Sequence, residues 1–223
     1  MIGSLRTSLE ARLVDAALAL QTACSLSQAQ TLLTYMAQMQ HWNRTYNLTA
    51  LRETDQILVQ HLFDSLAIVA PMCRVLSSRT NTVATIVDVG SGAGLPGVVL
   101  ATVQSGWQVH CVDAVEKKMA FVRQMSGVLQ LGNLHAIRAR IEKTESLGAD
   151  IVVSRAFASL RDFAALAGDQ TVTGGHLLAM KGHEPLDEIK ALEAETDWRV
   201  DRIESLIVPE LSADRCLVWM SRR

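Results

Sequence analysis

The fold of this chain is decided by the stretch Thr85-Ile86-Val87-Asp88-Val89-Gly90-Ser91-Gly92-Ala93-Gly94-Leu95-Pro96-Gly97. A short β-branched apolar run stops at a loop with glycine at every second position, and an apolar run with helical spacing follows from Leu95. The pattern predicts a strand, a tight turn and a helix, with Pro96 in the first helical turn, where its missing N–H costs nothing. Glycine is needed where φ is positive or where a ligand lies against bare backbone. We therefore predict a loop that cradles a nucleotide-like ligand, with a plain connecting turn as the alternative.

An acidic residue after the next apolar run supports a ligand site. The run Trp107–Val112 is predicted as a second buried strand, and Asp113 follows it. A carboxylate about 20 residues beyond a glycine-rich turn, at the carboxyl end of the second strand, is typical of sites that hold the two hydroxyls of a ribose. The alternative is that Asp113 only caps the helix that begins near Val115. Loop and acid together predict a ribose-bearing cofactor.

The glycine spacing indicates which cofactor. Gly90, Gly92 and Gly94 form G-x-G-x-G, whereas a dinucleotide fingerprint is G-x-G-x-x-G and rests a pyrophosphate on the helix N-terminus. Leu95 stands in the place of the third glycine, and a bulky residue there argues against the closest helix–strand packing. Asp88, just before the loop, would repel a pyrophosphate and tolerate a sulfonium. S-adenosylmethionine carries a sulfonium and no phosphate, so we predict that it is the cofactor.

The composition favours one large domain, or a domain with a small appendage. With 223 residues, 49% of them apolar, the chain can bury a sizeable core. The first twenty residues do not resemble a signal peptide, and no apolar stretch approaches the length of a membrane span. The cysteines show neither metal-ligand nor redox spacing; they are Cys24, Cys73, Cys111 and Cys216. We expect a cytoplasmic monomer that binds no metal and no membrane.

Two regions are expected to differ in architecture. Residues 1–80 are almost free of glycine and show helical spacing, with a capping box at Ser27-x-x-Gln30 and a helix from about Thr54 to Val69. In residues 81–223 strands alternate with helices, and the last two apolar runs are joined by a short turn. This order predicts an α/β fold with a seven-stranded, mostly parallel sheet and one antiparallel strand. Residues 1–80 are predicted to form a helical cap that packs on it.

Polar residues follow several of the predicted strands. In open α/β sheets the ligand lies beyond the carboxyl ends of the strands. We therefore expect one crevice to bring together Gly90–Gly94, Asp113, Ile141-Glu142, Ser154-Arg155 and Lys181-Gly182.

The helical region contains two polar groups of interest. The segment His41–Ala50, which includes Asn47, mixes aromatic, amide and basic side chains that suit an unstacked base, although its aromatics are more often core anchors. His61 and Asp64 share a helix face at the edge of an apolar stripe. A hydrogen-bonded structural cluster is the favoured reading of that pair, and direct catalysis is the alternative.

The formal charge of −2 conceals an uneven distribution. Residues 117–143 carry a net charge of +5, and residues 184–204 carry −5. A basic face can supply phosphate contacts that orient a polyanion, and an ordinary solvated helix flank is the alternative.

Several motifs together resemble the bacterial small-subunit 16S rRNA guanine-N7 methyltransferase family, first described as glucose-inhibited division protein B. The resemblance spans roughly residues 30 to 220, in the family's order. It rests on His41-Trp42-Asn43 with Tyr46-Asn47-Leu48-Thr49, His61-x-x-Asp64-Ser65, Asp88 to Gly97, Ser154-Arg155-Ala156-Phe157-Ala158-Ser159 and Lys181-Gly182.

The resemblance implies a Rossmann-like class I methyltransferase with a helical cap, acting on a guanine of 16S rRNA in the small ribosomal subunit, near the decoding centre. It places cofactor contacts at Gly90 and Leu95 in the loop, at Asp113 on the ribose, at Ile141-Glu142 around the adenine and at Arg155 beside the donor. Ala93 and Ala114 stand where the family commonly has Pro and Ser.

The expected chemistry needs no general base, because guanine N7 has a free lone pair and no proton to lose. We predict that Arg155 and Lys181 hold the guanine or its phosphate, and that Asn47, His61 and Asp64 line the same crevice. Two other classes stay open at this point. They are a nicotinamide oxidoreductase on the same fold, which Leu95 and Asp88 disfavour, and a non-catalytic module that binds the donor and ribosomal RNA.

Overall fold

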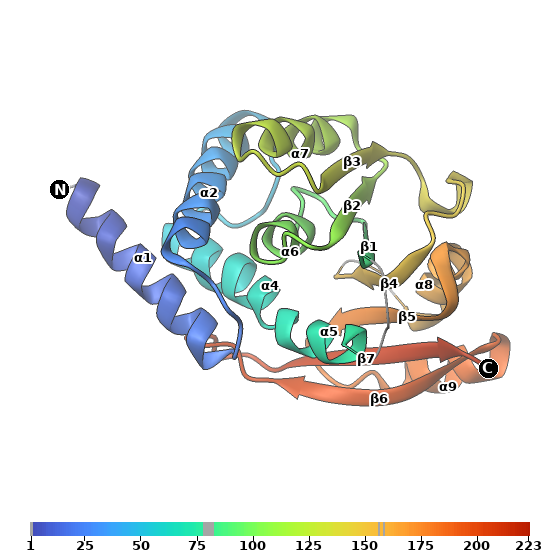
Figure 1. Ribbon diagram of the computed structural model, residues 1–223. Helices are drawn as coiled ribbons and strands as arrows, with labels where there is room; N and C mark the ends of the chain where they lie inside the picture. The colour runs from blue at the N-terminus through green and yellow to red at the C-terminus, as the bar shows by residue number, and fades with distance from the viewer. Residues whose placement is uncertain (1, 78–82, 156, 158) are drawn as a thin grey trace.

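The chain folds around one seven-stranded sheet that is covered by helices on both faces (Figure 1). The computed structural model describes residues 2–77, 83–155, 157 and 159–223, with side chains from residue 9 onward. The strands are β1 (Thr85–Val89), β2 (Gln108–Asp113), β3 (Leu134–Arg138), β4 (Ala149–Ser154), β5 (Thr171–Lys181), β6 (Trp198–Leu206) and β7 (Arg215–Arg222).

The strand order is β3-β2-β1-β4-β5-β7-β6, and only β7 runs against its neighbours among the described strands. Helical crossovers join the parallel strands, and a turn joins β6 to β7 as an antiparallel hairpin. The predicted seven-stranded, mostly parallel sheet with one reversed strand is confirmed.

Side chains alternate between the two faces because successive residues of a strand point in opposite directions. Ile151 and Val153 contribute to the core on the first face, and Val152 contributes to the second core. The first face is covered by α6 (Gly97–Val103), α7 (Glu116–Val128) and the helices of the N-terminal region. The second face is covered by α8 (Leu160–Ala167), α9 (Leu186–Glu195) and the short 3-10 helices η2 (Ile141–Lys143) and η3 (Gly168–Gln170).

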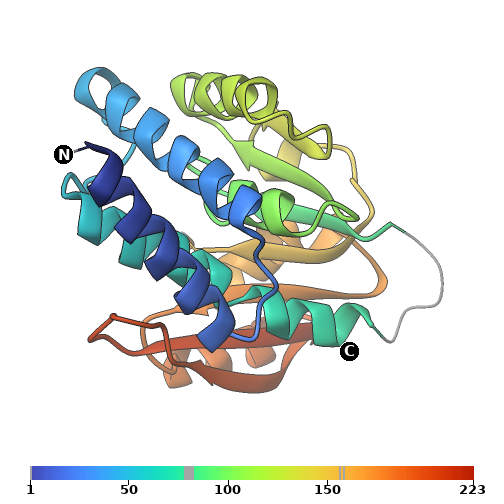
Figure 2. The same cartoon turned by 60° about the vertical axis from the view of Figure 1, so that its left-hand side comes forward.

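The N-terminal helices pack directly on the sheet domain. They are α1 (Ile2–Ala19), α2 (Leu26–Tyr46), α3 (Thr54–Ile57), the π-helix η1 (Leu58–Phe63), α4 (Asp64–Leu66) and α5 (Val69–Leu76). Figure 2 shows α1 and α2 side by side over the first face. Leu32 and Phe63 share one core with Phe121 and Trp219 of the sheet domain. The boundary predicted between residues 80 and 81 lies outside the described residues.

Helix α2 makes a second kind of contact with the sheet domain. The buried Tyr35 hydroxyl donates a hydrogen bond of 2.8 Å to the backbone oxygen of Ala93, inside the glycine loop. The capping box of α2 pairs Ser25 with Gln28, so the predicted box at Ser27 was wrong. A cap residue needs extended backbone, which Ser25 has, whereas Ser27 is already helical.

The third predicted helix differs from expectation in two ways. It changes to a π-helix over Leu58–Phe63, and after a short break the chain continues as α5, with Pro71 in that helix's first turn. The stretch Thr54–Leu76 therefore reaches 23 residues with a mean hydropathy of 1.3, which is long and apolar enough to cross a membrane. The expectation that no stretch approaches that length was wrong. Because 78% of the stretch's apolar window is buried inside the fold, it is a core segment.

Candidate active site

The glycine loop between β1 and α6 has a backbone that other residues rarely adopt. The φ angles of Gly90, Gly92 and Gly94 are 69°, 60° and 94°. A Cβ atom on Gly94 would come within 2.6 Å of Val98 Cγ2. The three glycines are therefore required by the turn itself, and α6 begins at Gly97, one residue after Pro96, not at Leu95 as predicted.

Gly97 allows the close helix–strand packing that the bulky Leu95 was predicted to disfavour. A Cβ atom there would lie 2.3 Å from Cys111 Sγ and 2.9 Å from Asp88 Oδ2, so α6 approaches β1 and β2 as closely as a glycine allows. Leu95 is buried and does not prevent this approach. Residue 97 takes over the packing role that a dinucleotide fingerprint gives to its third glycine.

Asp88 faces the loop's interior. Its side chain is fully buried, and Oδ2 accepts a hydrogen bond of 2.8 Å from the Gly97 N–H. Burial raises the pKa of this carboxyl to about 7, against the opposing effect of the Gly97 hydrogen bond. In the structure the carboxyl braces the start of α6. Its predicted preference for a sulfonium over a pyrophosphate stays a prediction.

Asp113 joins the loop to the next helix. Oδ2 accepts the Gly92 N–H at 3.0 Å, and Oδ1 accepts the Val115 N–H at 2.9 Å. Val115 is the N-cap residue of α7 and has no side-chain cap, so Asp113 braces the backbone ahead of the helix instead of capping it. The side chain also lines a cavity, so the carboxylate has a face toward a ligand as well as a face toward the backbone.

That cavity has a volume of about 320 Å³ and lies at the carboxyl ends of β1, β2 and β3. Of the predicted cofactor residues, it brings together Gly90, Asp113, Ile141 and Glu142. Gly92, Gly94 and Leu95 support the loop and are absent from the cavity's lining. Arg155, which was also predicted to contact the donor, is absent from it as well. The remaining wall was not predicted; it consists of Val89, Val112, Ala114, Ala139, Arg140, Phe157 and Leu166.

The lining fits S-adenosylmethionine. Bare backbone at Gly90 leaves room for a ligand, a carboxylate at Asp113 can accept from ribose hydroxyls, and the buried Ile141 offers an apolar surface to an adenine ring. No group of three metal-binding side chains occurs among the residues that the structure describes.

We expect Asp113→Ala to lower the affinity for S-adenosylmethionine about 10- to 100-fold, because hydrogen bonds to a charged group contribute about 1.5–3 kcal/mol. Calorimetric titration of the purified variant measures this, and Asp113→Asn, which keeps one acceptor oxygen, should fall between. Wild-type affinity in Asp113→Ala would leave the residue only its role of holding the loop backbone at Gly92 and Val115.

A second cluster surrounds Arg155, directly after β4. Arg155 Nη1 lies 3.3 Å from the Gln60 carbonyl oxygen, 3.4 Å from His61 Nδ1 and 3.5 Å from Asp64 Oδ2. Asp64, whose side chain is only 3% exposed, also accepts a hydrogen bond of 2.9 Å from Arg215 Nε. The cap helices and the sheet domain therefore meet at one buried carboxylate between two arginines. Arg215 was missed, although the first residue of a reversed strand lies at the same edge of the sheet.

His61 is held in its neutral form. Its Nε2 lies 2.8 Å from Thr49 Oγ1. Burial, followed by the charge of Arg155, lowers its pKa to about 4, against a raising effect of the Gln60 carbonyl. The residue therefore connects the Thr49 loop to Arg155 without carrying charge at neutral pH.

This shift has a consequence for stability. A histidine whose pKa falls on folding contributes stability that is present above about pH 6.5 and is lost as the pH falls toward 4. We expect His61→Gln to remove up to about 3 kcal/mol of that pH dependence. Denaturant titrations at several pH values between 4 and 7 measure it. An unchanged slope of unfolding free energy against pH would contradict the assignment.

Asn47 and Lys181 stand apart from Arg155. Asn47 is an exposed, left-handed residue at the end of α2, and its Oδ1 accepts from Arg52 at 3.4 Å. Lys181 pairs with Glu188 at 2.8 Å, and that same carboxylate accepts the Leu160 N–H at the start of α8. No hydrogen bond or ion pair joins either residue to Arg155 in the described part of the chain. Ala156 and Ala158 of the recognised motif are outside it.

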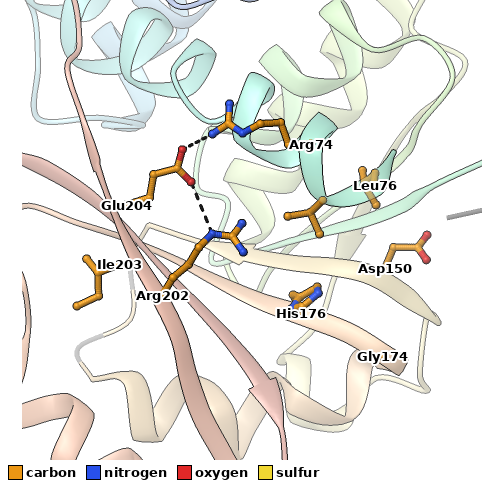
Figure 3. Close-up of a pocket in the computed structure, with 9 residues that line it drawn as sticks. Arg74, Leu76, Asp150, Gly174, His176, Arg202, Ile203 and Glu204 are labelled. Atoms are coloured by element: carbon orange, nitrogen blue, oxygen red, sulfur yellow. Dashed lines mark hydrogen bonds and ion pairs between the residues drawn. The ribbon is translucent and has the colours of Figure 1, made fainter. Parts of the chain in front are cut away.

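A larger cavity of about 680 Å³ lies elsewhere (Figure 3). It is lined by Asp150, Gly174 and His176, near the amino ends of β4 and β5, and Glu204 pairs there with both Arg74 and Arg202. Ligands of open α/β sheets bind at the opposite ends of the strands. The smaller cavity beside Asp113 is the better candidate.

Comparison with known proteins agrees with this geometry. The family described as rRNA small subunit methyltransferase G (GidB) matches residues 28–218. A relative from Bordetella petrii named Ribosomal RNA small subunit methyltransferase G is 60% identical over 88% of this chain and 76% of its own. A protein of the same name from Bordetella avium is 58% identical over 95% and 92%.

The fold has counterparts among solved structures. A SAM-dependent methyltransferase from Aquifex aeolicus superposes with a TM-score of 0.51 at 16% identity, over 69% of this chain and 90% of that one. This likeness supports the class I methyltransferase fold, and the sequence match supplies the family. The chain belongs to the rRNA small subunit methyltransferase G family, and it is an S-adenosylmethionine-dependent methyltransferase.

Proposed function

We propose that this protein transfers a methyl group from S-adenosylmethionine to N7 of one guanine in 16S rRNA, near the decoding centre of the small ribosomal subunit. The carrying observation is the Arg155 cluster, a cation held between sheet and cap directly after β4. Arg155 does not line the donor cavity, but Phe157, two residues further along the chain, does. The names of the relatives support small-subunit ribosomal RNA as the substrate.

When bound, S-adenosylmethionine supplies a methyl group on a positively charged sulfur, and transfer forms the N7–carbon bond as the sulfur–carbon bond breaks. N7 has no proton, so the neutral, buried His61 is not asked to act as a base. Arg155 orients the guanine through its edge or its phosphate. Holding the reacting atoms about 3–3.5 Å apart can contribute roughly 7–11 kcal/mol of the barrier reduction.

We assign supporting roles to the remaining predicted residues. Lys181 fixes the segment between β4 and α8 through Glu188, and Asp64 holds Arg155 in place. Asn47 belongs to the cap surface that meets the RNA. In this proposal residues 1–80 present the RNA and residues 81–223 hold the donor, in a cytoplasmic monomer without a metal ion.

The basic segment 117–143 is proposed as a further RNA-facing surface. Lys117 and Lys143 are exposed, whereas Glu116 partly offsets the charge through ion pairs with Arg138 at 3.1 Å and Arg123 at 3.9 Å. Its contribution is therefore long-range attraction more than a fixed contact.

Transfer of labelled methyl groups tests the proposal. The protein is mixed with labelled S-adenosylmethionine and either small subunits or deproteinised 16S rRNA from a strain that lacks this gene, followed by cleavage selective for N7-methylguanine. We expect label at a single guanine. Donor binding without label in either RNA would contradict the proposed substrate and leave the fold assignment intact.

A further inference from the structure

The cap carries a second polar cavity, distinct from the one beside Asp113. It has a volume of about 400 Å³ and lies between the end of α2 and the start of α3. Its lining is Gln40, Asn43, Arg44, Arg52 and Thr54, and these residues are called the cap cleft below. We propose that the cap cleft binds a backbone phosphate of the RNA, close to the target guanine. This inference rests on the proposed function, because it takes RNA as the substrate.

The two arginines of the cap cleft differ from most others in the chain. Among the described residues, neither Arg44 nor Arg52 has a carboxylate within 4.0 Å, and both are exposed. Arg52 reaches only the amide oxygen of Asn47, at 3.4 Å. Carboxylates do pair with Arg12, Arg74, Arg123, Arg138, Arg140, Arg155, Arg161, Arg199, Arg202, Arg215 and Arg222. The cap cleft therefore concentrates guanidinium donors that this protein does not neutralise itself.

The cleft is built in advance of any ligand. The Asn43 side chain is buried, its Oδ1 accepts the Thr49 N–H at 3.0 Å, and its Nδ2 donates to the Leu51 oxygen at 3.2 Å. Gln40 Nε2 donates to Thr54 Oγ1 at 3.0 Å, which leaves the Thr54 hydroxyl hydrogen for another acceptor. The side-chain amides of Gln40 and Asn43 therefore hold the walls of the cleft in place. The donors that remain, on the two arginines and the Thr54 hydroxyl, suit an anion with several acceptor oxygens.

The loop that forms one wall also reaches the Arg155 cluster. The Thr49 N–H donates to the Asn43 side chain, and Thr49 Oγ1 lies 2.8 Å from His61 Nε2. His61 Nδ1 in turn lies 3.4 Å from Arg155 Nη1. An anion in the cap cleft and a guanine at Arg155 would therefore lie on two sides of one short loop. A nucleic acid strand offers both groups in one molecule, with a phosphate beside every base, which is why we assign the cleft to the RNA backbone.

The test uses the full-length double variant Arg44→Gln/Arg52→Gln and a matched control, Arg199→Gln/Arg222→Gln. The control loses the same charge from side chains on β6 and β7 that are 59% and 53% exposed. Binding of deproteinised 16S rRNA is measured over a series of salt concentrations. For the cleft variant we expect a loss of about tenfold or more in affinity. Because one bound phosphate is lost, the log–log salt slope should fall in magnitude by about 0.7–0.9.

In methylation assays the cleft variant should show a higher KM for RNA. Its kcat at saturating RNA and its affinity for S-adenosylmethionine should stay unchanged. The control variant should behave like the wild type in all three measurements. An unchanged salt slope and KM would overturn the proposal. So would weaker binding to whole subunits with wild-type binding to the RNA alone, since the cleft would then contact a ribosomal protein.

If the glutamine variant also loses donor binding, the variant Arg44→Lys/Arg52→Lys tests the phosphate contact instead. It keeps both positive charges, so its salt slope should equal that of the wild type. If the wild type binds 16S rRNA but transfers no methyl group, the proposed function fails, and the salt slopes still decide whether the cleft binds phosphate.

Discussion

Arg155→Ala is expected to lower turnover about 100- to 1,000-fold while the affinity for S-adenosylmethionine stays within about threefold of wild type. The guanidinium is held by Asp64, Gln60 and His61 directly after β4. Under the proposed function, removing it takes away the group that orients the base. Donor contacts of the cavity beside Asp113 are untouched. Single-turnover methyl transfer and calorimetric donor titration separate the two effects.

A matched control for this change is Arg161→Ala. Arg161 lies at the start of α8 and pairs with Glu195 at 2.8 Å, away from the Asp64 cluster. We expect it to keep wild-type turnover. Arg155→Lys should recover only part of the rate, because an ammonium cannot reproduce the planar fork of donors. Wild-type turnover in Arg155→Ala would remove the residue from the reaction site.

Gly97→Ala is expected to destabilise the fold by about 3 kcal/mol, since overpacking a tight core forces neighbouring groups to move. The added Cβ would meet Cys111 Sγ at 2.3 Å and the buried Asp88 carboxyl at 2.9 Å. Denaturant unfolding measures the loss. Part of it should be recovered in Gly97→Ala/Cys111→Ala, because the nearer clash is then relieved.

The control is Gly106→Ala, where an added Cβ would meet no atom within 4 Å. We expect a change within about 0.5 kcal/mol there. Equal losses at positions 97 and 106 would contradict the steric explanation, because only one of the two sites is crowded.

The sheet and its ligand edge could be predicted because both follow from local patterns. Apolar runs ending in glycine or a polar residue marked the strands, and parallel strands bring such ends together, as Gly90, Asp113 and Ile141 show. The first residues of β5 and β6 are hard to recognise from the sequence, because exposed residues interrupt the apolar run there. They include Thr173 and Gly174 in β5, and Arg199 and Asp201 in β6.

The features that could not be predicted from the sequence depend on contacts between residues far apart in the chain or on the backbone conformation. Nothing in the local sequence distinguishes Gly97 from a spacer glycine, and the burial of Asp88 is decided by the approach of α6. The partnership of Asp64 with Arg215 joins residues far apart in the chain, so spacing could not reveal it. The two overlapping Ser-x-x-Gln patterns near residue 25 were equivalent until the backbone showed which serine is extended.

Helix α2 is bonded to the glycine loop near its middle and lines the cap cleft near its end. Tyr35 is bonded to the glycine loop, and Arg44, nine residues later on the same unbroken helix, lines the cap cleft. At 1.5 Å per residue these two points are about 14 Å apart along the helix axis. The helix therefore acts as a molecular ruler between donor and RNA backbone. Lengthening or shortening it would change which nucleotide of a bound strand stands opposite the methyl group.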